Sequence, residues 1–309
     1  MVMPTYNGSR YISTALESIA SEFAGDVEVI VVDDCSTDET PRLLKGTARR
    51  IPLHVVRNER QLGWVAATNV GFRLARGQWL CTLHQDDVWV TGHLSALRDA
   101  LRSSPEAGLI VGASIFIDDA GRPVGRWRLP WRGTSPDREE IARRLYVQNF
   151  LAIPATCIRA DTLRKVGALD EQLWYTADWD LWLRLARVTS VVTARGPLAG
   201  FRVHALSQTI SGSLDIPSFE RQLRLVQERH RWAAGGDHSV LAAGEAATRT
   251  NVALATMMHG GRANLGSLAE AAITMPPAGW VRYFRDSRII DRALPRVRLR
   301  LTARWRQPG

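Results

Sequence analysis

The chain has 309 residues, of which 45% are hydrophobic and 23% charged, so it can bury a substantial core in one large domain or two smaller ones. Its formal net charge is +9, and lysine occurs only at Lys45 and Lys165, so nearly all of the positive charge is arginine. This excess favours anionic partners, although a compositional preference for arginine explains it equally well. The three widely spaced cysteines argue against a disulfide framework or a zinc site, and no apolar run approaches the roughly 18 residues of a membrane span.

The first third of the chain alternates between strand and helix patterns. The segment "VEVIVVDD" is a continuous β-branched run, typical of a strand buried on both faces of a parallel sheet. Ser36 and Glu39 fit a capping box at the start of a helix. Alternation of this kind predicts right-handed crossovers and a doubly wound sheet. We expect a short strand within 1–7, further strands at 27–34, 52–59 and 78–84, and helices at 11–23, 35–46 and 63–77.

Polar stretches follow three of these strands at their carboxyl ends. They are "PTYNG" after the first strand, "DDCS" after the second and "HQDD" after the fourth. Open sheets of this type bind ligands outside the carboxyl ends of their strands, so we expect all three stretches to face one crevice.

Two of these stretches contain adjacent aspartates, which repel each other unless water or a cation relieves the repulsion. Asp86 and Asp87 have the oxygen chemistry of a Mg²⁺ or Mn²⁺ site, and the alternative is a polar turn. Asp33 and Asp34 end a buried strand, where they would either cap the next helix or accept hydrogen bonds from a nucleobase or a ribose.

Two later segments carry further candidate residues. In "YTADWDLWLRLARV", Asp178 starts an amphipathic helix, where it is either an N-cap or, desolvated by neighbouring aromatic rings, a general base. In "GFRVHALSQT", Arg202 and His204 share one face of an extended segment and suit a diphosphate, or else they are exposed residues of an edge strand. The small polar residues of 205–213 suit a mobile lid.

The remaining sequence divides by composition. A loop rich in Pro and Arg carries Trp127 and Trp131, whose rings would stack on a ligand or pack on C-terminal helices. From about residue 215 onward the sequence is rich in Ala, Arg and Gly with helical spacing, and it ends in a basic tail. We therefore expect a separate C-terminal part at 213–309.

Five segments, in order, resemble the family 2 glycosyltransferases, which have the GT-A fold. They are "MPTYNGSRYISTALESI", "EVIVVDDCSTDET", "NVGFRLARGQWLCTLHQDDVW", "VGALDEQLWYTADWDLWLRL" and "FRVH", and the likeness covers roughly residues 1–210. It implies an α/β fold with a Rossmann-like, mostly parallel sheet flanked by helices, followed here by a helical extension. It also implies inverting, metal-dependent transfer of a sugar from a UDP- or dTDP-sugar to an acceptor hydroxyl, in polysaccharide or glycolipid synthesis.

The resemblance also assigns roles to matching residues. It implies that 1–112 binds the nucleotide sugar and that 113–212 binds the acceptor and contains the base, Asp178. Mn²⁺ or Mg²⁺ would be held by Asp86, Asp87 and His204. The donor would be bound by Pro4, Thr5, Tyr6, Asp33, Asp34, Asp86 and Arg202, with Asp34 reading the nucleobase.

The chain departs from the family's pattern in three ways, one of which is a very short first strand before "PTYN". His84 stands where the DXD element usually begins with aspartate, and Ala177 replaces the glutamate of the ED-type motif. The proposed metal pair and the proposed base are nevertheless all present.

Other classes of protein fit the pattern less well. A Rossmann dehydrogenase would carry a GxGxxG turn after the first strand, and a nucleic-acid-binding protein would carry a recognisable signature, so we expect no nucleic-acid partner. A nucleotidyl or sugar-phosphate transferase, or an inactive nucleotide-sugar-binding relative, is the alternative function. Without a signal-peptide pattern we expect a cytoplasmic protein, whose basic tail would contact an anionic membrane and its lipid-linked acceptors.

Overall fold

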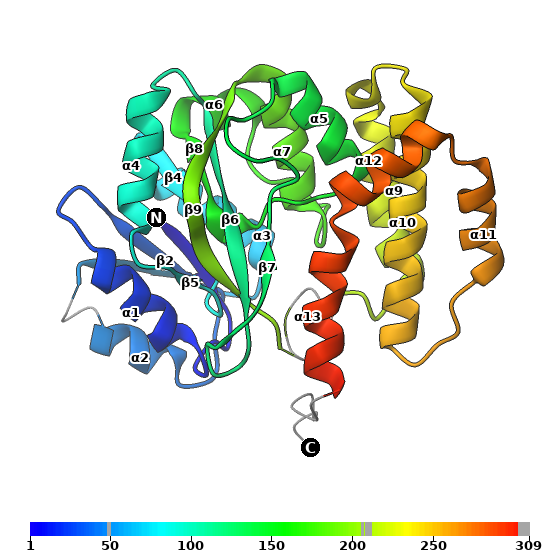
Figure 1. Ribbon diagram of the computed structural model, residues 1–309. Coiled ribbons are helices and arrows are strands. Elements are labelled where there is room, and N and C mark those ends of the chain that lie inside the picture. Colours follow the sequence, from blue (N-terminus) through cyan, green and yellow to red (C-terminus); the bar gives the residue numbers. More distant parts are fainter. Residues whose placement is uncertain (48–50, 205–206, 208–211, 302–309) are drawn as a thin grey trace.

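The computed structural model describes residues 1–47, 51–204, 207 and 212–301, which form two β-sheets with helices packed around them (Figure 1). The strands are β1 (Val2–Thr5), β2 (Val29–Asp33), β3 (Leu53–Arg57), β4 (Trp79–Cys81), β5 (Val88–Trp89), β6 (Leu109–Ile117), β7 (Pro123–Trp127), β8 (Thr156–Arg159) and β9 (Val191–Arg202). The helices are α1 (Ile12–Glu22), α2 (Thr40–Thr47), α3 (Trp64–Leu74), α4 (His93–Ser103), α5 (Arg138–Val147), α6 (Ala160–Val166), α7 (Ala177–Val188), α9 (Ile216–Arg229), α10 (His238–Met258), α11 (Leu265–Thr274), α12 (Pro277–Ser287) and α13 (Ile289–Leu301), with 3-10 turns η1 (Ile153–Ala155) and η2 (Arg231–Ala234).

The first sheet is parallel, in the order β1-β2-β3, and confirms the alternation predicted for the first third of the chain. Successive residues of β2 point to opposite faces, as the two-residue period of a strand requires. Val31 belongs to the core cluster that includes Leu16 of α1, whereas Ile30 belongs to the cluster that includes Ala67 of α3. Because the strand is covered on both faces, all five of its residues are buried.

The second sheet is mixed, in the order β4-β8-β6-β9-β5, with β7 on β6. Among its described pairs, β6 and β9 run parallel and the others antiparallel, so this sheet is less parallel than the N-terminal alternation indicated. The reason is partly local: Asp118 accepts hydrogen bonds from the backbone N–H groups of Ala120 and Arg122, and this tight turn joins β6 to β7 as a hairpin. A single parallel bridge between Val2 and Thr82 connects the two sheets.

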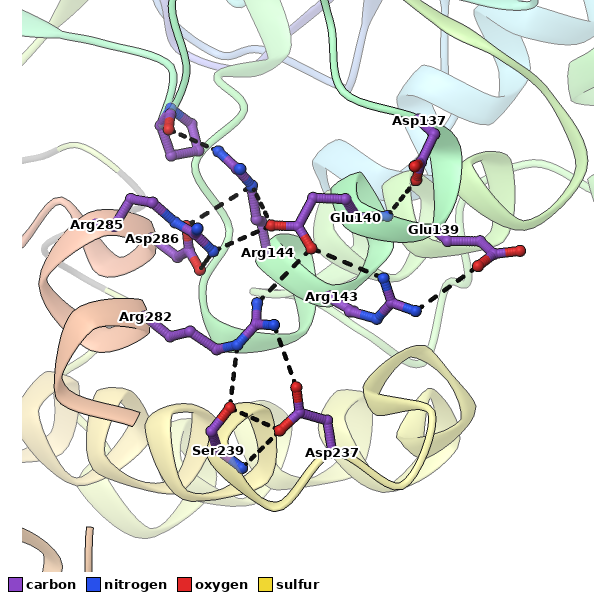
Figure 2. Close-up of polar contacts among 11 residues, drawn as sticks. Asp137, Glu139, Glu140, Arg143, Arg144, Asp237, Ser239, Arg282, Arg285 and Asp286 are labelled. Atoms are coloured by element: carbon purple, nitrogen blue, oxygen red, sulfur yellow. Dashed lines mark hydrogen bonds and ion pairs between the residues drawn. The ribbon is translucent and has the colours of Figure 1, made fainter. Parts of the chain in front are cut away.

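Helices α10 and α12 pack against α5, whereas α13 packs against β7 (Figure 1). Glu140 of α5 forms ion pairs with Arg144 of the same helix at 2.9 Å, and with Arg282 and Arg285 of α12 at 3.7 and 3.1 Å (Figure 2). Asp286, which is fully buried, accepts two hydrogen bonds from the Arg285 guanidinium. This network joins α12 to α5, while the division of the chain at 112 and 212 stays a prediction.

None of the helices within the described residues is long and apolar enough to cross a membrane.

Candidate active site

The loop after β1 is held by a side chain from the loop after β4. Gln85 Oε1 accepts hydrogen bonds from Thr5 Oγ1 at 2.6 Å and from the Tyr6 backbone N–H at 2.8 Å, and Gln85 Nε2 donates to the Tyr6 carbonyl at 3.1 Å. Pro4 and Thr5 are buried, whereas Tyr6 is 38% exposed. A Cβ at Gly8 would lie 2.3 Å from Gln85 Oε1, so the contact depends on glycine there. Two stretches predicted to share one edge are thus joined directly.

Asp33 and Asp34 are both buried, and their carboxylates bind neighbouring segments of the protein. Asp33 accepts hydrogen bonds from the Arg57 guanidinium and from the Ser36 backbone N–H. Asp34 accepts from Asn58 Nδ2 at 2.7 Å and from two backbone N–H groups of the 58–63 loop, at 2.8–3.0 Å. Both carboxylates therefore order the loops at the carboxyl ends of β2 and β3, and a contact with a nucleobase stays a prediction.

The segment before α2 and the first residue of that helix hold the 7–9 loop. Ser36 Oγ, Asp38 Oδ2 and Thr40 Oγ1 accept hydrogen bonds from its backbone N–H groups at 2.8–3.0 Å. Burial works against ionisation of Asp38, but hydrogen bonds from residues 9 and 40 lower its pKa to about 2. The capping box predicted from Ser36 and Glu39 is wrong, because α2 begins only at Thr40 and the Ser36 hydroxyl binds another loop.

The structure brings Asp86, Asp87, Arg202 and His204 together. Asp86 Oδ2 lies 2.8 Å from His204 Nε2, and Asp87 Oδ1 accepts the Arg202 backbone N–H at 2.9 Å. Burial and the charge of Asp86 raise the pKa of Asp87 well above its usual range. Burial also disfavours the ionised form of Asp86, but the hydrogen bond with His204 lowers its pKa. The ionised form is thus favoured at Asp86 and disfavoured at its neighbour Asp87.

Arg202 is only 3% exposed, and its guanidinium binds other parts of the protein. Its Nε donates to the Asp86 carbonyl at 2.7 Å, and its Nη1 donates to the carbonyls of Asp118 and Asp119 at 2.7 and 3.0 Å. The guanidinium also lies 4.8 Å from the ring centroid of Tyr11. Arg202 therefore orders the turn that contains the aspartate pair, and a direct contact with a diphosphate stays a prediction.

Asp178 lies in the first turn of α7, and Thr176 rather than Asp178 occupies the N-cap position. The Asp178 carboxylate accepts hydrogen bonds from Asn149 Nδ2 and from the Trp179 backbone N–H, both at 2.8 Å. Burial raises the pKa of Asp178 to about 6, and the two hydrogen bonds limit that rise. A carboxylate with a pKa close to neutral is well suited to accept a proton from a hydroxyl.

Trp64 contacts both the loop that contains the aspartate pair and the segment that precedes Asp178. Its ring meets His84 edge-on with 5.4 Å between centroids, and its Nε1 donates to the Trp174 carbonyl at 2.7 Å, four residues before Asp178. The His84 ring is neutral in this setting because burial lowers its pKa. Its Nε2 has no hydrogen-bond partner among the residues that the structure describes.

Sequence reasoning missed three residues of this site: Trp64, Gln85 and Asn149. Gln85 lies inside the "HQDD" stretch, so its position was a usable signal. Trp64 and Asn149 could not be found in this way, because their partners, Trp174 and Asp178, lie 110 and 29 positions away in the sequence. The predicted lid at 205–213 lies mostly outside the described residues.

The rings of Trp127 and Trp131 contact neighbouring parts of the protein, and stacking on an acceptor stays a prediction. The ring nitrogen of Trp127 donates to the Phe150 carbonyl at 2.7 Å, and that of Trp131 donates to Thr193 Oγ1 at 2.9 Å. Trp127 packs against Phe116, so these rings contact the second sheet and its neighbouring loop.

Comparison with known sequences supplies the family. Residues 1–167 match the family described as Glycosyl transferase family 2. An uncharacterized glycosyltransferase of Rickettsia prowazekii is 25% identical over 220 residues, covering 71% of this chain and 68% of the relative. One of Haemophilus influenzae is 24% identical over 233 residues, covering 74% and 76%. The succinoglycan biosynthesis protein ExoO of Rhizobium meliloti is 35% identical over 121 residues, covering 38% and 32%.

Solved structures share the fold. Residues 1–349 of Staphylococcus aureus TarS, in complex with UDP-GlcNAc, superpose with a TM-score of 0.63 at 17% identity, covering 94% of this chain and 90% of that one. The mannosyltransferase PcManGT of Pyrobaculum calidifontis, in complex with GDP-Man and Mn²⁺, superposes with a TM-score of 0.59 at 17% identity, covering 98% and 83%. The α/β arrangement with added C-terminal helices is therefore that of GT-A glycosyltransferases.

Proposed function

Because this chain belongs to glycosyl transferase family 2 and is a glycosyltransferase, we propose that it transfers a sugar, with inversion, from a nucleotide diphosphate sugar to an acceptor hydroxyl. The observation that carries the mechanism is the environment of Asp178. Its carboxylate is oriented by Asn149, and burial raises its pKa to about 6. At neutral pH most of this carboxylate is ionised, yet it is basic enough to take the acceptor's proton as the hydroxyl attacks.

Inversion requires one displacement and therefore one base. A retaining mechanism by way of a covalent intermediate would need a second carboxylate placed as a nucleophile. Asp180, the nearest acidic residue on α7, is occupied: it is bound to His230 at 2.8 Å and to Arg184 at 2.8 Å. Asp178 is the residue of this helix that we assign to proton transfer.

We propose that the donor lies along the loops after β1, β2 and β4. Tyr6 has an exposed ring that is free to stack on a nucleobase. Pro4, Thr5 and Arg202 shape the site from buried positions, and Asp33 and Asp34 order the loops at 35–40 and 58–63. UDP- and dTDP-sugars are the donors that we propose to test first, and GDP-sugars join them because PcManGT forms a complex with GDP-Man.

Asp86 and Asp87 suit a divalent cation, with His204 beside them. Among the described residues, no group of three or more His, Cys, Asp and Glu side chains is arranged to hold a metal alone. Two carboxylates are nevertheless sufficient for Mg²⁺ or Mn²⁺ when substrate phosphates supply the other ligands. Burial, together with repulsion from Asp86, raises the pKa of Asp87, and a bound cation would offset both effects by favouring the ionised carboxylate. Such a cation would supply positive charge next to the departing nucleoside diphosphate.

We further propose that the acceptor is a saccharide or a lipid-linked saccharide, met at an anionic membrane surface. Residues 262–309 contain ten arginines and three acidic residues, and so account for +7 of the net charge of +9. Val281 and Phe284 of α12 are 65% and 56% exposed. Arginine beside exposed apolar groups suits anionic headgroups. Flotation with anionic but not with neutral vesicles is the expected result, and equal recovery with both would remove this part of the proposal.

The function is tested by release of nucleoside diphosphate from UDP-, dTDP- and GDP-sugars, with Mn²⁺ and with EDTA. We expect metal-dependent release from one donor, lost in Asp178→Asn and Asp87→Asn. The matched control is Asp161→Asn, which removes an exposed carboxylate of α6 and should leave the rate unchanged. Donor binding without release by the wild-type chain, with any acceptor supplied, would instead identify an inactive relative.

A further inference from the structure

The segment after α5 lies between the proposed base and the C-terminal helices. Helix α5 ends at Val147, and the next residue, Gln148, is only 4% exposed. Its neighbour Asn149 points its side chain toward α7, whereas Gln148 points its side chain toward α10. Two adjacent amide side chains thus contact elements that are far apart in the sequence.

The Asn149 amide has a defined orientation. Its Oδ1 accepts the Leu151 backbone N–H at 3.2 Å, so its Nδ2 is the atom that donates to Asp178 Oδ2 at 2.8 Å. The other carboxylate oxygen accepts the Trp179 backbone N–H. With one donor on each oxygen, the plane of the Asp178 carboxylate is set from two directions.

Gln148 connects this pair of residues to the C-terminal helices. Its Oε1 accepts Asn251 Nδ2 of α10 at 2.8 Å, and its Nε2 donates to the Asn149 carbonyl at 3.3 Å. Asn251 Oδ1 in turn accepts from Arg292 Nη2 of α13 at 3.4 Å. A chain of hydrogen bonds therefore runs from α13 through α10 to the residue that contacts Asp178.

Other contacts keep the end of α5 in place. The Trp179 ring nitrogen donates to the Leu145 carbonyl at 2.6 Å, and the ion pairs of Glu140 fasten α5 to α12 (Figure 2). The backbone from which Asn149 projects is therefore fixed on one side by α7 and on the other by the C-terminal helices.

We propose that Asn149 is a positioning residue for Asp178, and that α10 keeps it in place through Asn251 and Gln148. The inference rests on the proposed function, since it takes Asp178 as the base. It gives the C-terminal extension a part in the chemistry: these helices hold the donor of the hydrogen bond that orients the base.

Asn149 also sets how readily Asp178 ionises. A hydrogen bond to the ionised form lowers a carboxyl pKa, so loss of the Asn149 donor raises the pKa of Asp178 further above 6. Several charged groups on the elements around α7 form ion pairs with one another, and none of these pairs includes Asp178. These pairs are Arg144 with Glu140, Arg164 with Asp161, Arg184 and His230 with Asp180, Arg229 with Asp170, and His204 with Asp86.

The test measures the pH dependence of nucleoside diphosphate release by Asn149→Ala and by the wild-type chain. We expect the acid limb of kcat/KM to move up by about one pH unit, because a charge-assisted hydrogen bond is worth about that much. On the alkaline side of the limb we expect roughly tenfold slower release, since the carboxylate is no longer oriented. Asn251→Ala should shift the limb in the same direction by less.

Carboxyl NMR of ¹³C-aspartate-labelled protein gives an independent readout, with the Asp178 signal assigned by its absence from Asp178→Asn. The Asp178 pKa should rise in Asn149→Ala and stay unchanged in Asn264→Ala, a matched Asn variant at the N-cap of α11. Asn149→Ser carries the same test if Asn149→Ala does not fold.

The outcomes separate the two proposals. If Asp178→Asn is inactive while the limb and the NMR pKa of the Asn149 variants match those of the wild type, this inference fails and the proposed base stands. If Asp178→Asn releases nucleoside diphosphate at the wild-type rate, the assignment of the base is wrong and this inference falls with it.

Discussion

The Gln85 side-chain amide binds both the backbone N–H and the backbone carbonyl of Tyr6, 79 positions earlier in the sequence. The Gln85 amide accepts from the Tyr6 N–H at 2.8 Å and donates to the Tyr6 carbonyl at 3.1 Å, much as a neighbouring strand would. The "PTYNG" loop and the "HQDD" loop are therefore one structural unit. Displacing either loop would displace both the exposed Tyr6 ring and the aspartate pair.

Replacement of Gln85 by Met should weaken donor binding. Methionine has a similar volume but cannot form the hydrogen bonds to Thr5 and Tyr6, each of which is worth about 1 kcal/mol. We expect a 5- to 30-fold rise in the Kd of the nucleotide sugar, measured by calorimetry, together with a loss of about 1–3 kcal/mol in the free energy of unfolding. Unchanged affinity would show that the loops keep their arrangement without Gln85.

Gly8→Ala should also weaken donor binding, because it displaces the Gln85 side chain from its contact with Tyr6. Its Cβ would meet Gln85 Oε1 at 2.3 Å and Thr5 Oγ1 at 2.8 Å, so the Gln85 side chain must move away. Because both changes break one contact, we expect the double variant with Gln85→Met to bind the donor no more weakly than the worse single variant. Gly25→Ala is the control, since a Cβ there meets nothing within 4 Å. Fully additive losses would contradict the shared contact.

Asp178→Asn should stabilise the fold at neutral pH while it abolishes transfer. The pKa of this carboxyl is raised from 3.8 to about 6 by burial, so the protonated form favours the folded state. As pH rises from about 4 to about 6 the unfolded chain ionises first and stability falls, and above 6 the loss is constant. The shift corresponds to about 3 kcal/mol, and the hydrogen bonds lost with the carboxylate reduce the expected gain to about 1–3 kcal/mol.

Urea denaturation at pH 4.5 and pH 7.5 checks this prediction. The difference in the free energy of unfolding between Asp178→Asn and the wild type should be larger at pH 7.5 than at pH 4.5. Equal differences at the two pH values would mean that Asp178 has an ordinary pKa in the folded state.

Glu140→Gln should destabilise the packing of α12 on α5. Glu140 faces Arg143 and Arg144 of its own helix and two arginines of α12, Arg282 and Arg285 (Figure 2). Its neutral replacement leaves these four partly buried guanidinium groups with less compensating charge. We expect a loss of about 1–3 kcal/mol in urea denaturation. Glu139→Gln is the matched control: its carboxylate is 72% exposed and paired only loosely with Arg143, so about 0.5 kcal/mol or less is expected. Similar losses in the two variants would exclude a special role for the Glu140 network.

The sequence predicted those parts of the candidate site that lie at the carboxyl ends of parallel strands. Because parallel strands end at one edge, the stretches after β1 and β2 had to meet, and the "HQDD" stretch joined them, as the Gln85–Tyr6 contact shows. The capping box failed because a serine and a glutamate three residues apart also occur where the serine hydroxyl binds another loop. Asp178 was correctly placed at the start of a helix, but not at its N-cap.

By itself, the amino-acid sequence determined the order of strands and helices in the first third, the positions of the aspartate pairs and the family. These features depend on periodicity and on short motifs, which lie within a few residues of one another. Only the tertiary structure decided that β7 and β8 run antiparallel to β6, that the Arg202 guanidinium is buried against backbone carbonyls, and that Asn149 meets Asp178. Each of these depends on contacts between segments whose side chains carry no local signal of their partner, because burial and hydrogen bonding are settled only when the whole chain packs.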